Sequence, residues 1–228
     1  MSESAGADRS GAATAQRFYG RWAGLYDAIA RRTPGVGSAR TAFADTLELE
    51  PGDTVVEMGC GTGANVPYLR ERVGDEGRVV GVDFTRPLLD RARENAQWAN
   101  VSFVRGDAAR PPVEGPVDAV VATFVVGMLS DPARAVDRWL DLLGPGGRLG
   151  LLDAASSRRW YATPANLGFR AFVRASAPST TRWSRGESPT AVLDRRVVDA
   201  RDALRRRTTR VEETERALGF LYLTVGRR

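Results

Sequence analysis

The sequence predicts an α/β fold in which a mainly parallel sheet of seven strands carries helices on both faces and ends in an antiparallel hairpin. Three observations support this prediction. Five short runs rich in valine and leucine are typical of strands buried on both sides. Amphipathic segments separate these runs, and repeated strand–helix–strand alternation indicates a parallel sheet. Finally, two strand-like runs near the C-terminal end follow each other across a short turn, so they pair antiparallel.

The elements can be placed in order along the chain. Helical patterns cover residues 13–33 and 38–49, and Pro51–Asp53 marks the entry to the sheet. The expected buried strands are Asp53–Met58, Gly77–Phe84, Val101–Asp107, Val117–Val126 and Gly147–Ala154. Helices are expected between them over residues 65–74, 85–99 and 131–144, each with a proline in its first turn, where proline is tolerated. A helix around Ala191–Arg205 then precedes strands Thr208–Glu215 and Phe220–Gly226, with the turn at Leu218 and Gly219.

The composition limits both the size of the protein and its chemistry. A chain of 228 residues, 43% of them apolar, has enough material for one ordinary core, so we expect one compact unit. The sequence contains no histidine and no lysine, so all 33 basic residues are arginine. This excludes Ser-His-Asp hydrolysis, Schiff-base catalysis, a phosphate-binding Walker lysine and histidine metal sites. Cys60 is the single cysteine, so no thiolate zinc site is expected either, and no metal is predicted.

Charge and hydropathy indicate where the protein works. The net charge of +5 is spread over many helices, which favours a solvated surface over a nucleic-acid groove. No apolar run is long enough to span a membrane, and the first residues lack the basic start and apolar middle of a secretion signal. We therefore expect a cytoplasmic protein.

The stretch VVEMGCGTGAN, residues 55–65, places three glycines between a buried strand and a helix. A glycine-rich turn at this position lets the backbone and the free N–H groups of the helix approach a nucleoside-bearing ligand. Asp83 ends the next strand, twenty residues past Gly63, which suits the two hydroxyls of a ribose. The loop alone also satisfies a looser dinucleotide pattern through Gly59, Gly61 and Ala64, so it does not exclude NAD. Glu57, however, favours a cationic ligand with an ammonium and a sulfonium, because its negative charge would repel phosphates.

Five ordered motifs carry a resemblance to a known family. They are VVEMGCGTG, VVGVDFT, VRGDAARPP, VDAVVATFVVGMLSDPARAV and LLGPGGRLGLLD, and together they cover roughly Thr46 to Ala154. In this order the motifs resemble those of class I S-adenosylmethionine-dependent methyltransferases, of the ubiquinone/menaquinone-biosynthesis (type 11) group. The resemblance implies a Rossmann-like fold with a reversed seventh strand, and S-adenosyl-L-methionine as the cofactor.

The resemblance also implies roles for individual residues of the first two motifs. Glu57, Gly59 and Gly61 would border the methionine part of the cofactor, the glycines mainly through their backbone. Gly63 belongs to the same cofactor-binding loop. Asp83 would bind the ribose hydroxyls.

The later motifs imply the remaining contacts. Phe84 would lie along the adenine, Asp107 would meet the adenine amino group, and Ala108 would offer its backbone. Thr123, at the end of the fourth strand, would sit near the methyl donor. Two local interpretations remain open: Asp107 as a helix cap and Thr123 as a satisfied strand-end hydroxyl. Cys60 is interpreted as a small residue in the loop without a basic neighbour to activate it.

Methyl transfer needs positioning and exclusion of water, and a base only if the acceptor is protonated. Without histidine, the candidate bases are Tyr26, Asp27, Tyr161 and Asp153. Tyr26 and Asp27 are the predicted catalytic pair, because FYGRWAGLYDAIARR resembles the N-terminal helix with a Tyr-Asp pair found in quinone-biosynthesis methyltransferases. A helix that simply packs its aromatic residues on the sheet fits the same pattern. An acceptor as acidic as a phenol or hydroquinone would need no protein base.

The predicted organisation is an N-terminal segment with lid helices over residues 1–45 and a methyltransferase domain over 46–228. The domain contains an inserted substrate or lid segment at about 155–190, which is long for a connection in a compact domain. In this segment Phe169, Phe172 and Val173 are expected on one helical face beside Arg170 and Arg174. Such a face suits peripheral contact with an anionic membrane, closure over an apolar substrate, or packing on the sheet.

The predicted function is methylation of a small, hydrophobic or lipid-like acceptor, such as a quinol, a phenol or a lipid head group. Two alternatives remain open. One is an RNA or nucleic-acid methyltransferase, although ATFV stands where amino-methylating enzymes usually carry an Asn/Asp-Pro-Pro-Tyr motif. The other is a non-catalytic module that binds S-adenosylmethionine.

Overall fold

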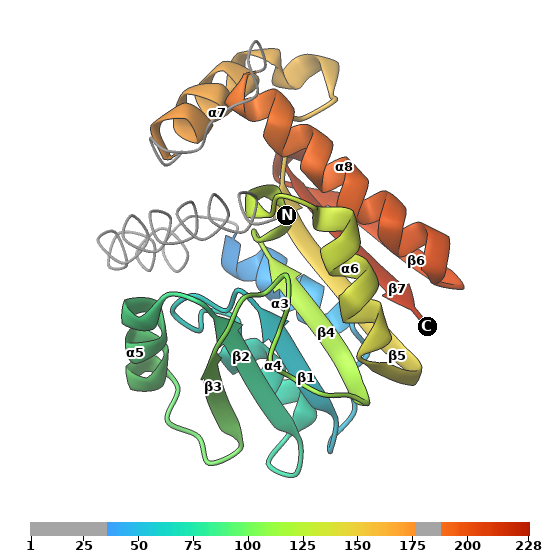
Figure 1. Cartoon of the computed structure of the whole chain (residues 1–228). Coiled ribbons are helices and arrows are strands. Elements are labelled where there is room, and N and C mark those ends of the chain that lie inside the picture. The colour runs from blue at the N-terminus through green and yellow to red at the C-terminus, as the bar shows by residue number, and fades with distance from the viewer. Residues whose placement is uncertain (1–35, 177–187) are drawn as a thin grey trace, which may run out of the picture.

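The computed structural model describes residues 36–176 and 188–228, and within them it contains one sheet of seven strands in the order β3-β2-β1-β4-β5-β7-β6 (Figure 1). The strands are β1 (Thr54–Met58), β2 (Arg78–Asp83), β3 (Val101–Arg105), β4 (Val117–Thr123), β5 (Leu143–Ala154), β6 (Arg210–Arg216) and β7 (Leu221–Arg227). Strands β1 to β5 are parallel, whereas β7 runs antiparallel to both β5 and β6. This arrangement confirms the predicted fold class, including the C-terminal hairpin.

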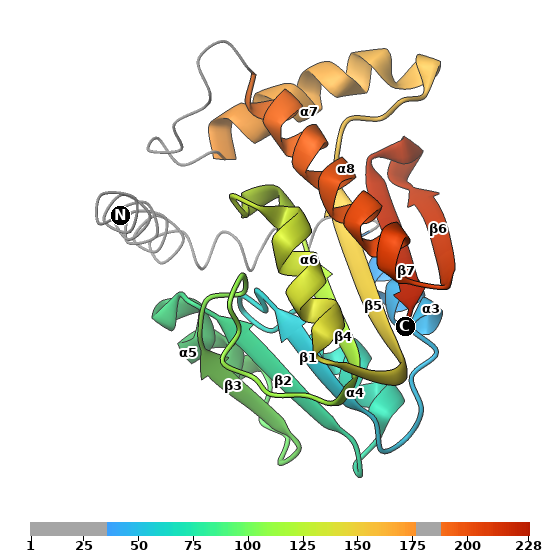
Figure 2. The ribbon, with the colours of Figure 1, turned by 45° about the vertical axis from the view of Figure 1, so that its right-hand side comes forward.

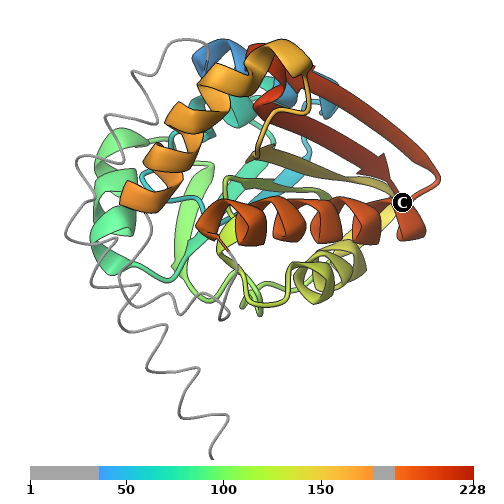
Figure 3. The same cartoon turned by 90° about the horizontal axis from the view of Figure 1, so that it is seen from above.

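The helices form layers on both sides of the sheet. They are α3 (Val36–Thr46), α4 (Val66–Val73), α5 (Arg86–Asn95), α6 (Pro132–Asp141), α7 (Thr163–Ser176) and α8 (Pro189–Arg207). Short 3₁₀ turns are η1 (Val126–Met128), η2 (Trp160–Ala162) and η3 (Ala217–Gly219). Helices α6 and α8 cover one face, and α3 and α4 lie behind the sheet in the same view (Figure 2). Seen from above, α7 crosses over the edge where the parallel strands end (Figure 3).

Each face of the sheet has its own apolar core. The cluster under α6 and α8 includes the fully buried Trp139, whose indole Nε1 donates to the carbonyl of Ala108 at 2.7 Å. The opposite cluster brings α3 directly onto β5. A side-chain carbon at Gly150 would lie 2.7 Å from Leu47 and 2.8 Å from Phe43, so only glycine fits there. Helix α3 is therefore part of the packed domain.

Several predicted elements differ from the structure. Strand β4 ends at Thr123, three residues before its predicted end, and β5 begins at Leu143, four residues before its predicted start and inside the predicted helix 131–144. Strand β3 is only partly buried, because it lies at the edge of the sheet. The prediction that this strand is buried on both faces is therefore wrong. Helix α5 ends at Asn95, four residues before its predicted end. The chain turns there because the amide of Asn100 donates to the carbonyls of Gly74 and Gly77, both at 2.8 Å, and this directs residues 96–100 into β3.

The C-terminal region is held by polar contacts as well as by apolar packing. Strand β6 is exposed along most of its length. Glu213 on this strand accepts hydrogen bonds from Arg201 at 2.9 Å and from Arg205 at 2.8 Å, both on α8. The predicted turn between β6 and β7 is confirmed: Leu218 and Gly219 both have positive φ.

Helix α7 forms within the segment expected to cover the site, but its apolar residues do not share one face. Val173 is buried and Phe169 packs on Phe220 with the ring centroids 5.4 Å apart, whereas Phe172 is 53% exposed. Adjacent helical residues point about 100° apart, so burying Val173 turns Phe172 outward, and the predicted common face is wrong. Within the described ranges no helix is long and apolar enough to cross a membrane.

Candidate cofactor site

The glycine loop joins β1 to α4 at the edge where the parallel strands end. Its glycines 59, 61 and 63 all have positive φ, between 54° and 73°. A side-chain carbon at Gly61 would have no atom within 4 Å, whereas one at Gly59 would lie 2.4 Å from Cγ2 of Val125. Gly61 therefore borders open space that a ligand can enter. Gly59 is required by the packing of the loop against the segment that follows β4.

Asp83 ends β2 beside this open space and is only 6% exposed. Its carboxylate accepts the backbone N–H of Gly61 at 3.0 Å and that of Thr85 at 2.8 Å. Burial raises the pKa of Asp83, and the hydrogen bonds from Thr85 and Gly61 partly oppose this rise. Asp83 thus fixes the glycine loop to the end of β2.

Glu57 lies in a buried network that joins four parts of the chain. Its side chain is 2% exposed, and its Oε1 accepts Nδ2 of Asn65 at 2.5 Å. The same amide nitrogen donates to Oγ1 of Thr123 at 2.7 Å, and Nη1 of Arg40 donates to Oδ1 of Asn65. Arg40 also lies over the ring of Phe124, 5.9 Å from its centroid. The network links α3, β1, the glycine loop and the end of β4.

One oxygen of Glu57 has no donor in the described part of the chain. Among the described residues, Oε2 is buried without a hydrogen-bond partner, an arrangement that costs free energy unless a ligand supplies a donor. Burial raises the pKa of Glu57 to about 7, although Asn65 and the charge of Arg40 oppose the rise. An incoming ammonium group would satisfy this oxygen and favour its charged form.

The donor and acceptor set fits an aminoacyl nucleoside better than a dinucleotide. Two buried carboxyl groups, Glu57 and Asp83, lie at the loop whose Gly61 borders open space. Carboxylates accept hydrogen bonds from hydroxyl and ammonium groups but repel a pyrophosphate.

The residues of the third motif form a turn beside the same edge. Oδ1 of Asp107 accepts the N–H of Ala109 at 2.9 Å, so Asp107 stabilises a turn and does not cap a helix. The carbonyl of Ala108 is occupied by Trp139. Phe84, directly after β2, is partly buried, and its carbonyl accepts Nε of Arg105 at 3.3 Å.

The two candidate bases that the structure describes, Asp153 and Tyr161, lie outside the network of Glu57. Asp153 is 2% exposed on β5 and shares the α8 side of the sheet with Leu151, whereas Thr123 points to the opposite side. Burial raises the pKa of Asp153 to about 7 against the opposing charge of Arg201 and the N–H of Val126. Tyr161 lies on η2 and is 46% exposed. Tyr26 and Asp27 lie outside the described residues.

Cys60 is buried in the loop, and burial raises the pKa of its thiol well above the ordinary value. This agrees with its interpretation as an unreactive packing residue.

Two residues of the network were not predicted from the sequence. Asn65 precedes α4 at the position of a helix cap, yet its side chain makes no cap bond and turns to Glu57 and Thr123 instead. Arg40 lies on α3, an element that the motifs do not include. A polar residue two positions after the last loop glycine is a signal for Asn65, but nothing local marks Arg40.

The strand order, the reversed β7 and the acids at the ends of β1 and β2 define the class of Rossmann-like, nucleoside-binding methyltransferase folds. A family model described as a methyltransferase domain matches residues 55–147. A putative methyltransferase from Haloferax volcanii, solved in complex with the Trm112 methyltransferase activator, has a similar fold: the TM-score is 0.65 at 23% identity, over 89% of this chain and 95% of that one.

Among sequence relatives, the nocamycin O-methyltransferase of Saccharothrix syringae is 35% identical over 170 residues, which are 70% of this chain and 58% of that protein. The 2-phytyl-1,4-naphtoquinone methyltransferase of Thermosynechococcus vestitus is 35% identical over 111 residues, 48% of this chain and 49% of that protein. The chain spans about half the length of the curated relatives that it matches. It belongs to the class I S-adenosylmethionine-dependent methyltransferases, whose cofactor is S-adenosyl-L-methionine.

Proposed function

We propose that this chain transfers a methyl group from S-adenosylmethionine to an oxygen of a small, largely apolar acceptor such as a phenol or a hydroquinone. The observation that carries the proposal is the buried Oε2 of Glu57, which has no partner among residues 36–176 and 188–228 and lies next to a glycine loop with open space at Gly61. Family membership supports the cofactor, and the relatives named for an O-methyltransferase and a naphtoquinone methyltransferase support the acceptor class.

The network residues would hold the methionine end of the cofactor. Glu57 would accept hydrogen bonds from the ammonium group, and Asn65 would keep the carboxyl group of Glu57 in place. Arg40, which bonds to Asn65, provides a positive charge close to this negative one. Opposite charges bridged by one amide suit the zwitterionic end of an amino acid.

The nucleoside end would lie along β2 and the turn of the third motif. Asp83 would accept the ribose hydroxyls, and Gly61 leaves room for the ribose beside it. Phe84 would lie along the adenine, with Asp107 and Ala108 at its edge. Thr123 would border the methyl donor. Its hydroxyl and Glu57 both accept hydrogen bonds from Nδ2 of Asn65, so Thr123 lies close to the proposed site of the methionine end.

When bound, the cofactor supplies a methyl group activated by a sulfonium. The protein then has to place the acceptor in line, keep water out and, for a protonated acceptor, remove a proton. Asp153 is buried on the α8 side of the sheet and Tyr161 is exposed on η2, so neither is positioned beside Thr123. Tyr26 and Asp27 therefore remain the proposed base pair, unless the acceptor is acidic enough to lose its proton unaided.

Helix α7 would cover the acceptor. It crosses over the edge of the sheet where the cofactor loop lies (Figure 3), and η2 and α7 expose Trp160, Leu167 and Phe172. Large apolar side chains above a reaction site exclude water and contact an apolar acceptor. If this surface instead served peripheral membrane contact, the protein would sediment with anionic vesicles, and the Trp160→Ser variant would not.

Calorimetric titration with S-adenosylmethionine and with NADH tests the cofactor, and a screen of phenols and hydroquinones with radiolabelled S-adenosylmethionine tests the reaction. We expect binding of S-adenosylmethionine alone and transfer of label to at least one phenolic oxygen. Binding of NADH alone would refute the proposal. Binding without transfer to any acceptor would indicate a cofactor-binding module, and transfer only to RNA would indicate a nucleic-acid methyltransferase.

A further inference from the structure

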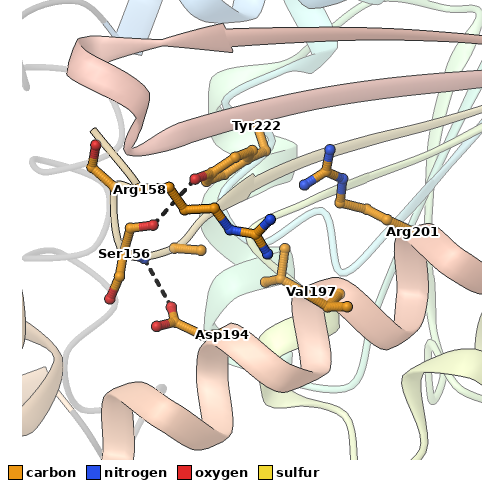
Figure 4. A pocket seen from close by; sticks show the side chains of 9 residues that line it. Ser156, Arg158, Asp194, Val197, Arg201 and Tyr222 are labelled. Carbon is orange, nitrogen blue, oxygen red and sulfur yellow. Dashed lines mark hydrogen bonds between the residues drawn. The ribbon is translucent and has the colours of Figure 1, made fainter. Parts of the chain in front are cut away.

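A second hollow lies at the same edge of the sheet, over β5 and β7 and against α8. It has a volume of about 210 Å³. The side chains that determine its chemistry are Ser156, Arg158, Asp194, Arg201 and Tyr222 (Figure 4). Val197 forms its apolar floor between Asp194 and Arg201 on α8.

Arg201 is held rigidly at one end of this pocket. Its Nε donates to Oγ1 of Thr224 at 3.1 Å, and its Nη2 donates to Glu213 at 2.9 Å. Its guanidinium carbon lies 4.9 Å from the centroid of the Tyr222 ring. These contacts leave Nη1 without a partner among the described residues and fix the direction in which it points. A cation fixed in this way loses little entropy when it binds a ligand.

Arg158 enters the same pocket from the segment between β5 and η2. Its side chain extends across the hollow towards Val197 and Arg201 (Figure 4). Arg158 is exposed, and within the described part of the chain it has neither an ion pair nor a hydrogen bond. Two guanidinium groups that face one pocket repel each other unless an anion lies between them.

Three acids lie near the pocket: Asp194 and Glu213, which accept hydrogen bonds from the protein, and the buried Asp153, which faces the charge of Arg201. Asp194 accepts the backbone N–H of Ser156 at 2.8 Å, and Glu213 is bound by both Arg201 and Arg205. The hydroxyl of Tyr222 donates to the carbonyl of Ser156 at 3.1 Å. Among the described residues, the charged donors that line the hollow without a partner are those of Arg158 and Arg201. Donors of this kind match the oxygens of a carboxylate or a phosphate.

We propose that this pocket is an oxyanion-binding subsite and that the anion is an acid group of the methyl acceptor. The second half of this statement rests on the function proposed above. Strands lie about 4.8 Å apart, and β5 and β7 are the second and third strands from β1. An acid group in the pocket therefore lies roughly 10–15 Å along the sheet from the glycine loop. The acceptor would be an elongated organic acid whose methylated atom, near the end of β4, is separate from its acid group.

The subsite itself is tested without any activity measurement. Inorganic phosphate is titrated by calorimetry, and crystals are soaked with selenate, whose anomalous signal locates the bound anion. We expect a millimolar phosphate affinity and a selenate peak between Arg158 and Arg201. Arg158→Gln should weaken phosphate binding at least fivefold. Arg206→Gln, which removes the same charge from α8 outside the pocket, should leave it unchanged. Equal affinities in both variants, or no selenate peak in the pocket, would overturn the subsite.

The link to the acceptor is tested with pairs of aromatic acceptors that differ only in one carboxylate remote from the methylated hydroxyl. In Arg158→Gln the KM for the acid should rise about tenfold with kcat within twofold, and the KM for its uncharged partner should not change. A rise for both acceptors or for neither would refute the link. Calorimetry of the wild-type protein with S-adenosylmethionine separates the two proposals. Wild-type protein that binds phosphate but not S-adenosylmethionine would refute the proposed function and leave the anion subsite standing.

Discussion

Glu57 on β1 and Asp153 on β5 are two buried carboxyl groups on strands that are separated by β4, and they differ in what can reach them. Both are 2% exposed, both have one oxygen without a partner among the described residues, and burial raises the pKa of each to about 7. Glu57 lies beside a loop that borders open space. Asp153, in contrast, accepts the backbone N–H of Val126 and faces the charge of Arg201. Burial and a raised pKa are therefore not enough to identify a ligand site, because a ligand must also be able to reach the carboxyl group.

The largest effect should come from Asp83, which borders the accessible region. Asp83→Ala removes the proposed ribose contact and also the bonds that hold Gly61 and Thr85. Hydrogen bonds to a charged group contribute about 1.5–3 kcal/mol each, so the affinity for S-adenosylmethionine should fall at least 100-fold in calorimetry. Asp90→Ala, which removes an exposed acid on α5, should stay within twofold of the wild type. Equal losses in both variants would mean that the site was misplaced.

The two loop glycines should separate binding from folding. An added methyl group enters open space at Gly61 but meets Val125 at Gly59. Gly61→Ala should therefore weaken S-adenosylmethionine binding about 30-fold, with a stability loss of about 1 kcal/mol from its positive φ. Gly59→Ala should lose about 2–4 kcal/mol, because overpacking adds to the same backbone cost.

Chemical denaturation and calorimetry measure both quantities for these glycine variants. Val125→Ala should restore part of the stability of Gly59→Ala, since it removes the colliding methyl groups. If Gly61→Ala binds as tightly as the wild type, the open space beside Gly61 is not the cofactor cleft.

The pH dependence of cofactor binding should report on Glu57. An ammonium group favours the carboxylate form, and the pKa of the free protein's Glu57 is about 7. Below pH 7 a proton must leave on binding, so the affinity for S-adenosylmethionine should be about tenfold lower at pH 6 than at pH 8. Glu57→Gln should bind more weakly at pH 8 and show no such dependence. A wild-type affinity that is constant from pH 6 to 8 would contradict the assignment.

Asp153 should affect stability and leave cofactor binding unchanged. Its pKa of about 7 lies above the ordinary value of 3.8. The folded state therefore keeps a proton that the unfolded chain has already released between these pH values. Stability falls as pH rises through this window, so Asp153→Asn should raise the free energy of unfolding by about 1–3 kcal/mol at pH 8.

At pH 4 the same variant should unfold at the temperature of the wild type, because Asp153 is then protonated in the folded protein. Its affinity for S-adenosylmethionine should remain within twofold of the wild type. A loss of affinity comparable to that of Glu57→Gln would show that Asp153 is accessible from the cofactor cleft.

The central strands could be predicted from the sequence because their burial depends on local apolar runs. β1 and β4 are buried along most of their length, and most of their residues are apolar. β3 has a similar composition, but its place at the edge depends on the strand order, which no local pattern encodes. The same limit applies to Phe172, whose exposure depends on how α7 is rotated on the rest of the domain.

The candidate site was predicted where its residues are contiguous in the sequence. Glu57, the loop glycines and Asp83 belong to two short motifs next to strand ends. Arg40 and Asn65, in contrast, meet Glu57 through tertiary packing. Arg158 and Arg201 likewise come from segments more than forty residues apart, so the second pocket could be recognised only in the structure.

Strand β6 has a consequence for the behaviour of the protein in concentrated solution. It forms the outer edge of the sheet, and its sequence RVEETER places a charged side chain at most positions. An unprotected edge strand offers free backbone groups that can pair with another chain and start aggregation, and charged side chains oppose such pairing. We expect the charged side chains of β6 to prevent edge-to-edge pairing between copies of the protein. The C-terminal hairpin then completes the sheet without promoting the growth of fibres.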